Sequence, residues 1–128
     1  MPKFELLHLQ RPEGERETPE FDKFFDAMMG SPSAAVSEGM YAHVATPECE
    51  TIDEIYRLTN SFEEPWFENE AAGALVAPLR SLMVGDIVRN EEGDFYACLP
   101  VGWGQIEDTH GRLAACIEVE EPTPGLIP

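Results

Sequence analysis

The stretch RSLMVGDIVRNEEGDFYACLPVGWGQI, residues 80–106, decides the fold that this sequence predicts. Two short apolar runs, 84–88 and 95–99, flank a glycine-containing connection at residues 90–94. Runs of this kind, joined by three to five residues, are typical of a β-hairpin. Pro100 has no N–H to give to a β-ladder, which predicts that the second strand ends or bulges there. The stretch therefore predicts a β-hairpin in the core of the fold.

Two helices are predicted on the N-terminal side of the hairpin, and each begins at a threonine. Thr18 is a candidate N-cap before Pro19, a residue that the first helical turn accepts. Thr51 and Glu54 form a capping-box pattern at the start of a second helix, residues 51–60. The first helix carries an apolar stripe at helical spacing: Phe21, Phe24, Phe25 and Met28. A stripe of this kind is far more often part of a core than of a ligand site.

Three further strands are predicted outside the hairpin, at residues 4–9, 40–46 and 112–119. Residues 31–39 are small and polar with one proline, which predicts a mobile loop. Residues 121–128 are rich in proline and predict a loosely held tail. The sum is a single α+β domain over residues 1–128, with two helices on a mainly antiparallel sheet around a central β-hairpin.

Charge is the strongest global property of the sequence. It has 25 Asp and Glu against 8 Lys and Arg, a formal net charge of -17. Such an excess serves solubility alone or builds a surface that meets a cationic partner. Direct binding of DNA or RNA is not expected, because a nucleic-acid binder needs basic patches for the phosphates. The absence of a long apolar run predicts a cytoplasmic protein without a membrane segment.

The cysteines and histidines do not form a recognisable chemical constellation. They are scattered singly, with no pair at metal-ligand spacing: Cys49, Cys98, Cys116, His8, His43 and His110. The nucleophile-elbow motif and the glycine-rich phosphate-binding motifs do not occur in the sequence. The expectation is therefore no catalytic residue, no metal and no cofactor, and a protein that is not an enzyme.

The acidic segment from Glu48 to Glu70 is the best functional candidate. It carries eight acids against Arg57 alone: Glu48, Glu50, Asp53, Glu54, Glu63, Glu64, Glu68 and Glu70. Trp66 is a candidate aromatic anchor for a partner on this acidic face. The alternative is a solvated acidic face over a buried Trp66.

Arg80 is the only basic residue between Arg57 and Arg89. We expect Arg80 to pair with Asp86 across the turn at Gly85, in a structural role. The sequence Gly-Trp-Gly at residues 102–104 predicts a bend around one large ring.

The same residues carry a resemblance to a known group of proteins. The segments IYRLTNSFEEPW, from Ile55, and RSLMVGDI, from Arg80, resemble small proteins of phages, plasmids and other mobile elements, and more loosely the YodL-like domain. These proteins have an R-S-x-S-V-G-D-V/I segment after an I/V-Y-x-L-T-N segment. Met83 stands where serine is usual, and Trp103 replaces a phenylalanine. The matching motif residues are Arg80, Ser81, Val84, Gly85, Asp86 and Ile87. The resemblance covers residues 55–106 and implies a mobile-element accessory gene.

The mobile-element origin that the resemblance implies and the negative net charge together lead to a functional hypothesis. The chain is expected to be a non-enzymatic inhibitor that occupies a basic nucleic-acid-binding surface of a host protein or ribonucleoprotein, in a CRISPR or restriction system. Small acidic proteins of mobile elements often resemble inhibitors of this anti-CRISPR or anti-restriction type. One alternative is a small-ligand or enzymatic domain that uses Arg80, Asp86 and Trp103 in a pocket beside the hairpin. The other is an accessory protein of phage or plasmid replication.

Overall fold

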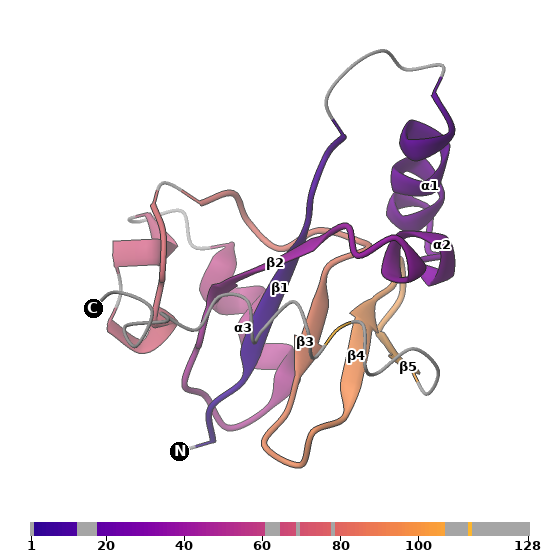
Figure 1. Ribbon diagram of the computed structural model, residues 1–128. Helices are drawn as coiled ribbons and strands as arrows, with labels where there is room; N and C mark the ends of the chain where they lie inside the picture. The colour runs from indigo at the N-terminus through magenta and orange to yellow at the C-terminus, as the bar shows by residue number, and fades with distance from the viewer. Residues whose placement is uncertain are drawn as a thin grey trace, which may run out of the picture.

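A computed structural model describes residues 2–12, 18–60, 65–68, 70–77, 79–106 and 113. These residues form one five-stranded antiparallel sheet with the strand order β2-β1-β3-β4-β5 (Figure 1). The strands are β1 (Glu5–Leu9), β2 (Tyr41–Ala45), β3 (Ile87–Arg89), β4 (Phe95–Cys98) and β5 (Trp103–Ile106). The predicted α+β class with a mainly antiparallel sheet is confirmed.

The predicted hairpin is also confirmed, as the pair β3 and β4. Ile87 lies opposite Ala97, and the ladder continues to the end of β3. The connection is held by Asn90, whose side-chain oxygen accepts hydrogen bonds from the amides of Glu92 at 3.0 Å and Asp94 at 2.9 Å. β4 ends at Cys98, two residues before Pro100, and the chain then turns into β5.

Within the described ranges, three α-helices flank the sheet: α1 (Pro19–Met28), α2 (Ser33–Ser37) and α3 (Ile52–Thr59). Two short 3-10 turns, η1 (Trp66–Glu68) and η2 (Glu70–Ala72), follow α3. The predicted cap of α1 is confirmed, because Thr18 Oγ1 accepts a hydrogen bond from the Phe21 amide at 3.2 Å. At α3 the capping box is wrong, since Thr51 makes no side-chain cap and the Glu54 carboxylate accepts from the Glu50 amide at 3.0 Å.

The loop prediction for residues 31–39 is wrong, because α2 lies inside this segment. Pro32 and Gly39, which indicated a loop, are instead at the two ends of the short helix. Ala35 and Val36 are buried in the core that α2 shares with α1. A helix of one turn is stabilised by such packing rather than by its own propensity.

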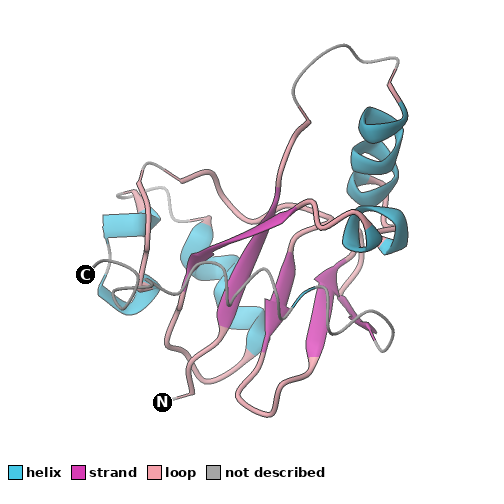
Figure 2. Cartoon of the chain, in the orientation of Figure 1, coloured by secondary structure: helices cyan, strands magenta, loops and turns pink. Residues whose placement is uncertain are grey.

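The sheet takes part in two core clusters; in the view of Figure 2, α3 lies behind the sheet, and α1 and α2 stand beside its upper end. Successive strand residues point to opposite faces. Leu7 and Ile87 therefore join one core cluster with α1 and α2, whereas Leu6 and Val88 join a second cluster with α3 and Trp66. The interior strands β1 and β3 are therefore buried on both faces over most of their length.

Some predictions fall on residues outside the described ranges. The predicted last strand at residues 112–119 lies there except for Leu113, which is buried in the cluster on the α1 side. The predicted tail at residues 121–128 lies there too. Within the described ranges, no helix combines the length and the apolar character needed to cross a lipid bilayer.

Candidate functional site

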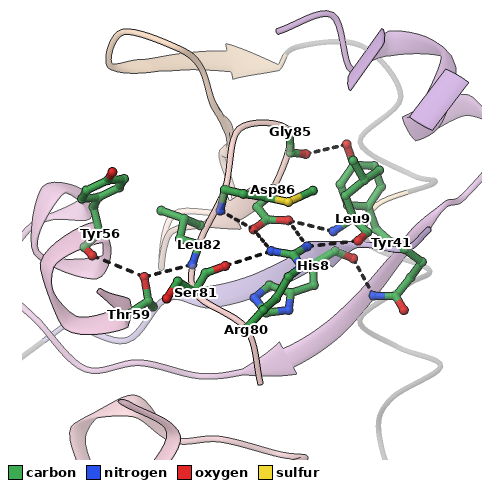
Figure 3. A network of polar contacts seen from close by, with 12 residues as sticks. His8, Leu9, Tyr41, Tyr56, Thr59, Arg80, Ser81, Leu82, Gly85 and Asp86 are labelled. Atoms are coloured by element: carbon green, nitrogen blue, oxygen red, sulfur yellow. Dashed lines mark hydrogen bonds and ion pairs between the residues drawn. The ribbon is translucent and has the colours of Figure 1, made fainter. Parts of the chain in front are cut away.

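The most connected polar group of the described chain is the Asp86 carboxylate, at the start of β3. Asp86 is completely buried and accepts four hydrogen bonds (Figure 3). Two come from the Arg80 guanidinium, at 2.7 Å and 2.8 Å. The others come from the amides of Leu9 at 2.8 Å and Met83 at 2.9 Å. We call residues 80–86 the clamp segment, because this carboxylate ties them to the end of β1.

Arg80 is the partly exposed partner in the clamp. Its two terminal nitrogens also donate to the carbonyl oxygens of Ser81 and Leu9, each at 3.0 Å. All four terminal N–H groups of the guanidinium are therefore used within the chain. The predicted Arg80–Asp86 ion pair is confirmed. Its geometry is that of a fixed cross-link between β1 and the turn before β3.

Gly85 and Leu82 connect the clamp segment to three further elements. Gly85 has φ +99°, and a Cβ there would lie 2.8 Å from the Ala27 carbonyl oxygen of α1. Its own carbonyl accepts a hydrogen bond from the Tyr41 hydroxyl of β2 at 2.7 Å. The Leu82 amide donates to Thr59 Oγ1 of α3 at 3.1 Å. The spacing of arginine, glycine and aspartate in this motif is thus explained by packing between both layers of helices.

His8 lies in β1 beside the clamp and is only 4% exposed. Its ring meets that of Trp66 edge-on, with 6.4 Å between the centroids. Burial lowers the pKa of His8 from 6.5 to about 4; Asp86 opposes this shift and Arg80 adds to it. The imidazole is therefore neutral near pH 7. Its Nε2 is buried without a hydrogen-bond partner in the described structure, a feature for which the sequence holds no signal.

Folding stability should depend on pH through His8. The unfolded chain takes up a proton near pH 6.5 and the folded chain only near pH 4, so protonation favours unfolding between these values. The contribution of neutral His8 is complete above pH 6.5 and should fall by about 3 kcal/mol as pH approaches 4. Urea unfolding of the wild type and of His8→Leu, at neutral pH and at about pH 4, measures it. Carboxylates titrate in both proteins, so equal pH dependence in the two would contradict the assignment.

An open groove of about 710 Å³ adjoins the clamp, between α1 and the segment that precedes Arg80. Phe25 and Met28 line it and are 52% and 37% exposed. The expectation that the stripe of α1 is core is therefore wrong for Phe25 and Met28. It is confirmed for Phe24, with Phe21 packed against the same cluster. Phe24 and Ala27 hold α1 to the sheet, and the next positions around the helix face the groove.

The predicted pocket of Arg80, Asp86 and Trp103 is not formed. Arg80 lines the groove, but Asp86 is completely buried and Trp103 lies on β5, packed against the cluster on the α3 side. Cys98 and Cys49 are buried, and burial is the main cause that raises the pKa of each thiol to about 11. Both thiols are therefore protonated and poorly nucleophilic near neutral pH.

Several acidic residues before, within and after α3 are carried by segments that lie next to one another. The Glu48 amide donates to the Ala71 carbonyl at 2.7 Å, which places β2's exit beside η2. Glu48, Glu54 and Ala71 line a common hollow. We call the described acids of this region the acidic end: Glu48, Glu50, Asp53, Glu54, Glu68 and Glu70. Glu63 and Glu64 lie outside the described residues.

The acidic end has a strong excess of negative charge, and one exposed cation, Arg57, lines the same hollow as Glu48 and Glu54. All of its acids except the half-buried Glu54 are exposed, and none forms a salt bridge within the described ranges. The carboxylates of Glu54 and Glu50 add to burial in raising the pKa of Cys49. Among all residues that the structure describes, no three His, Cys, Asp or Glu side chains gather as a metal-ligand set.

Trp66 is not a surface anchor, which corrects its assignment as a partner-binding residue. The ring is only 4% exposed and belongs to the core cluster on the α3 side. Its indole N–H donates to the Arg80 carbonyl at 3.1 Å, and Phe67 packs against it edge-on. The side chain fills the space between β1 and the clamp segment. The burial of Trp66 agrees with the alternative, in which the acids lie over a buried ring.

The resemblance to mobile-element proteins remains a prediction. The clamp gives its motif a structural role in this chain, whatever the origin of the gene. No protein family, curated protein or solved structure matches the chain.

Proposed function

We propose that this chain is a non-enzymatic binding protein that presents its acidic end to a basic, nucleic-acid-binding surface of another protein or ribonucleoprotein. The observation that carries the proposal is the gathering of exposed carboxylates from three segments, unpaired within the described ranges, in a chain of net charge -17. The expected partner is a host defence complex of the CRISPR or restriction type, and the expected compartment is the cytoplasm.

The physical basis is imitation of a phosphate backbone. A nucleic-acid-binding groove is built for closely spaced negative charges, and complementary potentials raise association rates by about 10–10³-fold at low salt. Each exposed ion pair contributes only about 0–1 kcal/mol, so affinity must come from several carboxylates acting together. The backbone hydrogen bond from the Glu48 amide to the Ala71 carbonyl keeps the chain segments that carry Glu48 and Glu70 next to each other.

The test is simultaneous charge reversal. Glu48, Glu50, Glu68 and Glu70 are changed to lysine, and inhibition of DNA cleavage is measured with purified CRISPR nucleases and restriction endonucleases. We expect wild-type protein to inhibit at least one enzyme, with association that slows as salt rises toward physiological strength, where the Debye length is about 8 Å. The quadruple variant should associate at least about tenfold more slowly, through lost steering and repulsion.

A matched control separates the acidic end from net charge alone. Asp22, Asp26, Glu91 and Glu92 are also exposed but lie on α1 and on the hairpin turn. Their reversal to lysine makes the same change in net charge and should leave inhibition largely intact. Equal loss in both quadruple variants would show that only overall charge matters. Unchanged inhibition by the first variant would refute binding through the acidic end.

A further inference from the structure

The groove beside α1 has the dimensions of a small-molecule site. Its volume of about 710 Å³ falls in the ordinary range for such sites, about 300–1,000 Å³. One wall is the exposed stripe of α1, with Phe25 and Met28, and the other includes Val76, which is 50% exposed. These side chains keep apolar surface in contact with water. An apolar ligand body would remove that surface from water.

Two polar side chains that line the groove along the exit of β1 are not used by the clamp. Arg11 lies with its guanidinium 5.7 Å from the centre of the Phe21 ring, and it forms no salt bridge in the described structure. His8 contributes a buried, neutral imidazole whose Nε2 lacks a partner there. Arg80 also lines the groove, but the clamp already uses its terminal N–H groups. The available cation is therefore Arg11.

We infer that the groove binds an elongated, mostly apolar monocarboxylate that carries a second hydrogen-bonding group. The carboxylate pairs with Arg11, the body packs against Phe25, Met28 and Val76, and the second group bonds to His8 Nε2. His8 and Arg11 are three residues apart, so their Cα atoms are at most about 10 Å from each other. An eight-carbon chain is long enough to reach between two residues within this limit. This site is separate from the acidic end, and the inference does not depend on the proposed function.

Three probes test the two polar contacts separately: 8-hydroxyoctanoate, octanoate and octan-1-ol. Dissociation constants are measured by isothermal titration calorimetry, and the site is located by NMR chemical shifts. We expect 8-hydroxyoctanoate to bind most tightly and octan-1-ol about tenfold more weakly than octanoate, because a charge-assisted hydrogen bond is lost. Octan-1-ol that binds as tightly as octanoate, or no binding by any probe, would overturn the proposal.

Substitutions assign each contact. Arg11→Gln should weaken both acids about tenfold and leave octan-1-ol unchanged. Arg89→Gln is the matched control, because Arg89 also lies over a phenylalanine ring, at 5.5 Å from Phe95, but does not line the groove. Equal effects of the two arginine variants would contradict the carboxylate contact.

His8→Leu should weaken the hydroxy acid and leave octanoate unchanged, since a hydroxyl group at this position would then be buried without a partner. The affinity of this variant for octanoate shows whether the groove is still formed. If His8→Leu does not fold, the arginine variants and the three probes still decide the outcome. Phe25→Ser should weaken all three probes. A chain that dimerises through this groove, becomes monomeric with Phe25→Ser and binds no probe would show a protein interface instead.

Discussion

Asp86→Ala should reduce the free energy of unfolding by about 3–5 kcal/mol, the usual cost of removing one partner of a buried ion pair. The carboxylate is completely buried and accepts four hydrogen bonds. Its removal leaves the amides of Leu9 and Met83 without acceptors and the Arg80 charge without its partner. Urea unfolding followed by tryptophan fluorescence measures the change. Since a domain is stable by only about 5–15 kcal/mol, Asp86→Asn should be measured alongside as a milder variant.

Removing Arg80 should cost less than removing Asp86. The Arg80 side chain is 37% exposed, so water can reach its position and replace part of what the guanidinium donates to Asp86. The Asp86 side chain is completely buried, so water does not easily reach the donors that lose their acceptor in Asp86→Ala. In Arg80→Met the two backbone amides still hold the carboxylate. Combined, Arg80→Met and Asp86→Ala should destabilise by less than their sum, because they remove the same pair. Full additivity would show that the pair is not coupled.

Glu92→Ala is the control for these variants. Glu92 is an exposed acid on the hairpin turn, and only its backbone amide makes a hydrogen bond that is described. Its replacement should change stability by no more than about 0.5 kcal/mol. A loss of several kcal/mol at Glu92 would mean that net charge, rather than the clamp, determines stability.

The hairpin and the ion pair were predictable because their signals are local. Asn90 and Gly93 identify the turn, and Arg80 and Asp86 carry opposite charges only six residues apart. The amide of Leu9 also binds Asp86, across 77 residues of chain. No local pattern indicates that contact. The complete burial of Asp86 depends on it and so could not be predicted.

Other elements could not be predicted because their environment comes from distant segments. Trp66 stands among exposed acids in the sequence, and only His8 of β1 and the Arg80 carbonyl show that its ring is core. The stripe of α1 has regular helical spacing, but spacing does not show that the sheet covers only part of the helix. The groove therefore has no counterpart in the sequence pattern, although Phe25 and Met28 were correctly placed on one helix.

The acidic end could be predicted in part, because its charges are local but their arrangement is not. The charges of Glu48 and Glu70 are visible in the sequence, whereas their proximity comes from the hydrogen bond between Glu48 and Ala71. An acidic segment without this contact would spread its charges along a flexible chain. The structure thus adds spatial order to a property that composition already indicates.

Ile87→Ala should also be strongly destabilising, by about 2–5 kcal/mol. Ile87 is completely buried in β3, between Leu7 of β1 and Ala97 of β4 on the same face of the sheet. The neighbouring Ala97 is too small to fill the space that the lost side chain leaves. The resulting cavity adds its own cost to the lost burial. The free energy of unfolding, obtained from urea denaturation, measures the total.

A graded series distinguishes a cavity from a general loss of apolar surface. Ile87→Val removes one methyl group and should cost about 0.5–1.5 kcal/mol, well below Ile87→Ala. Val101→Ala is the matched control, since Val101 is 90% exposed and should change stability by no more than about 0.5 kcal/mol. A loss well under about 1 kcal/mol for Ile87→Ala would show that this position is not part of a close-packed core. The order of the three variants matters more than any single value, because the remaining cavity volume sets the cost at Ile87.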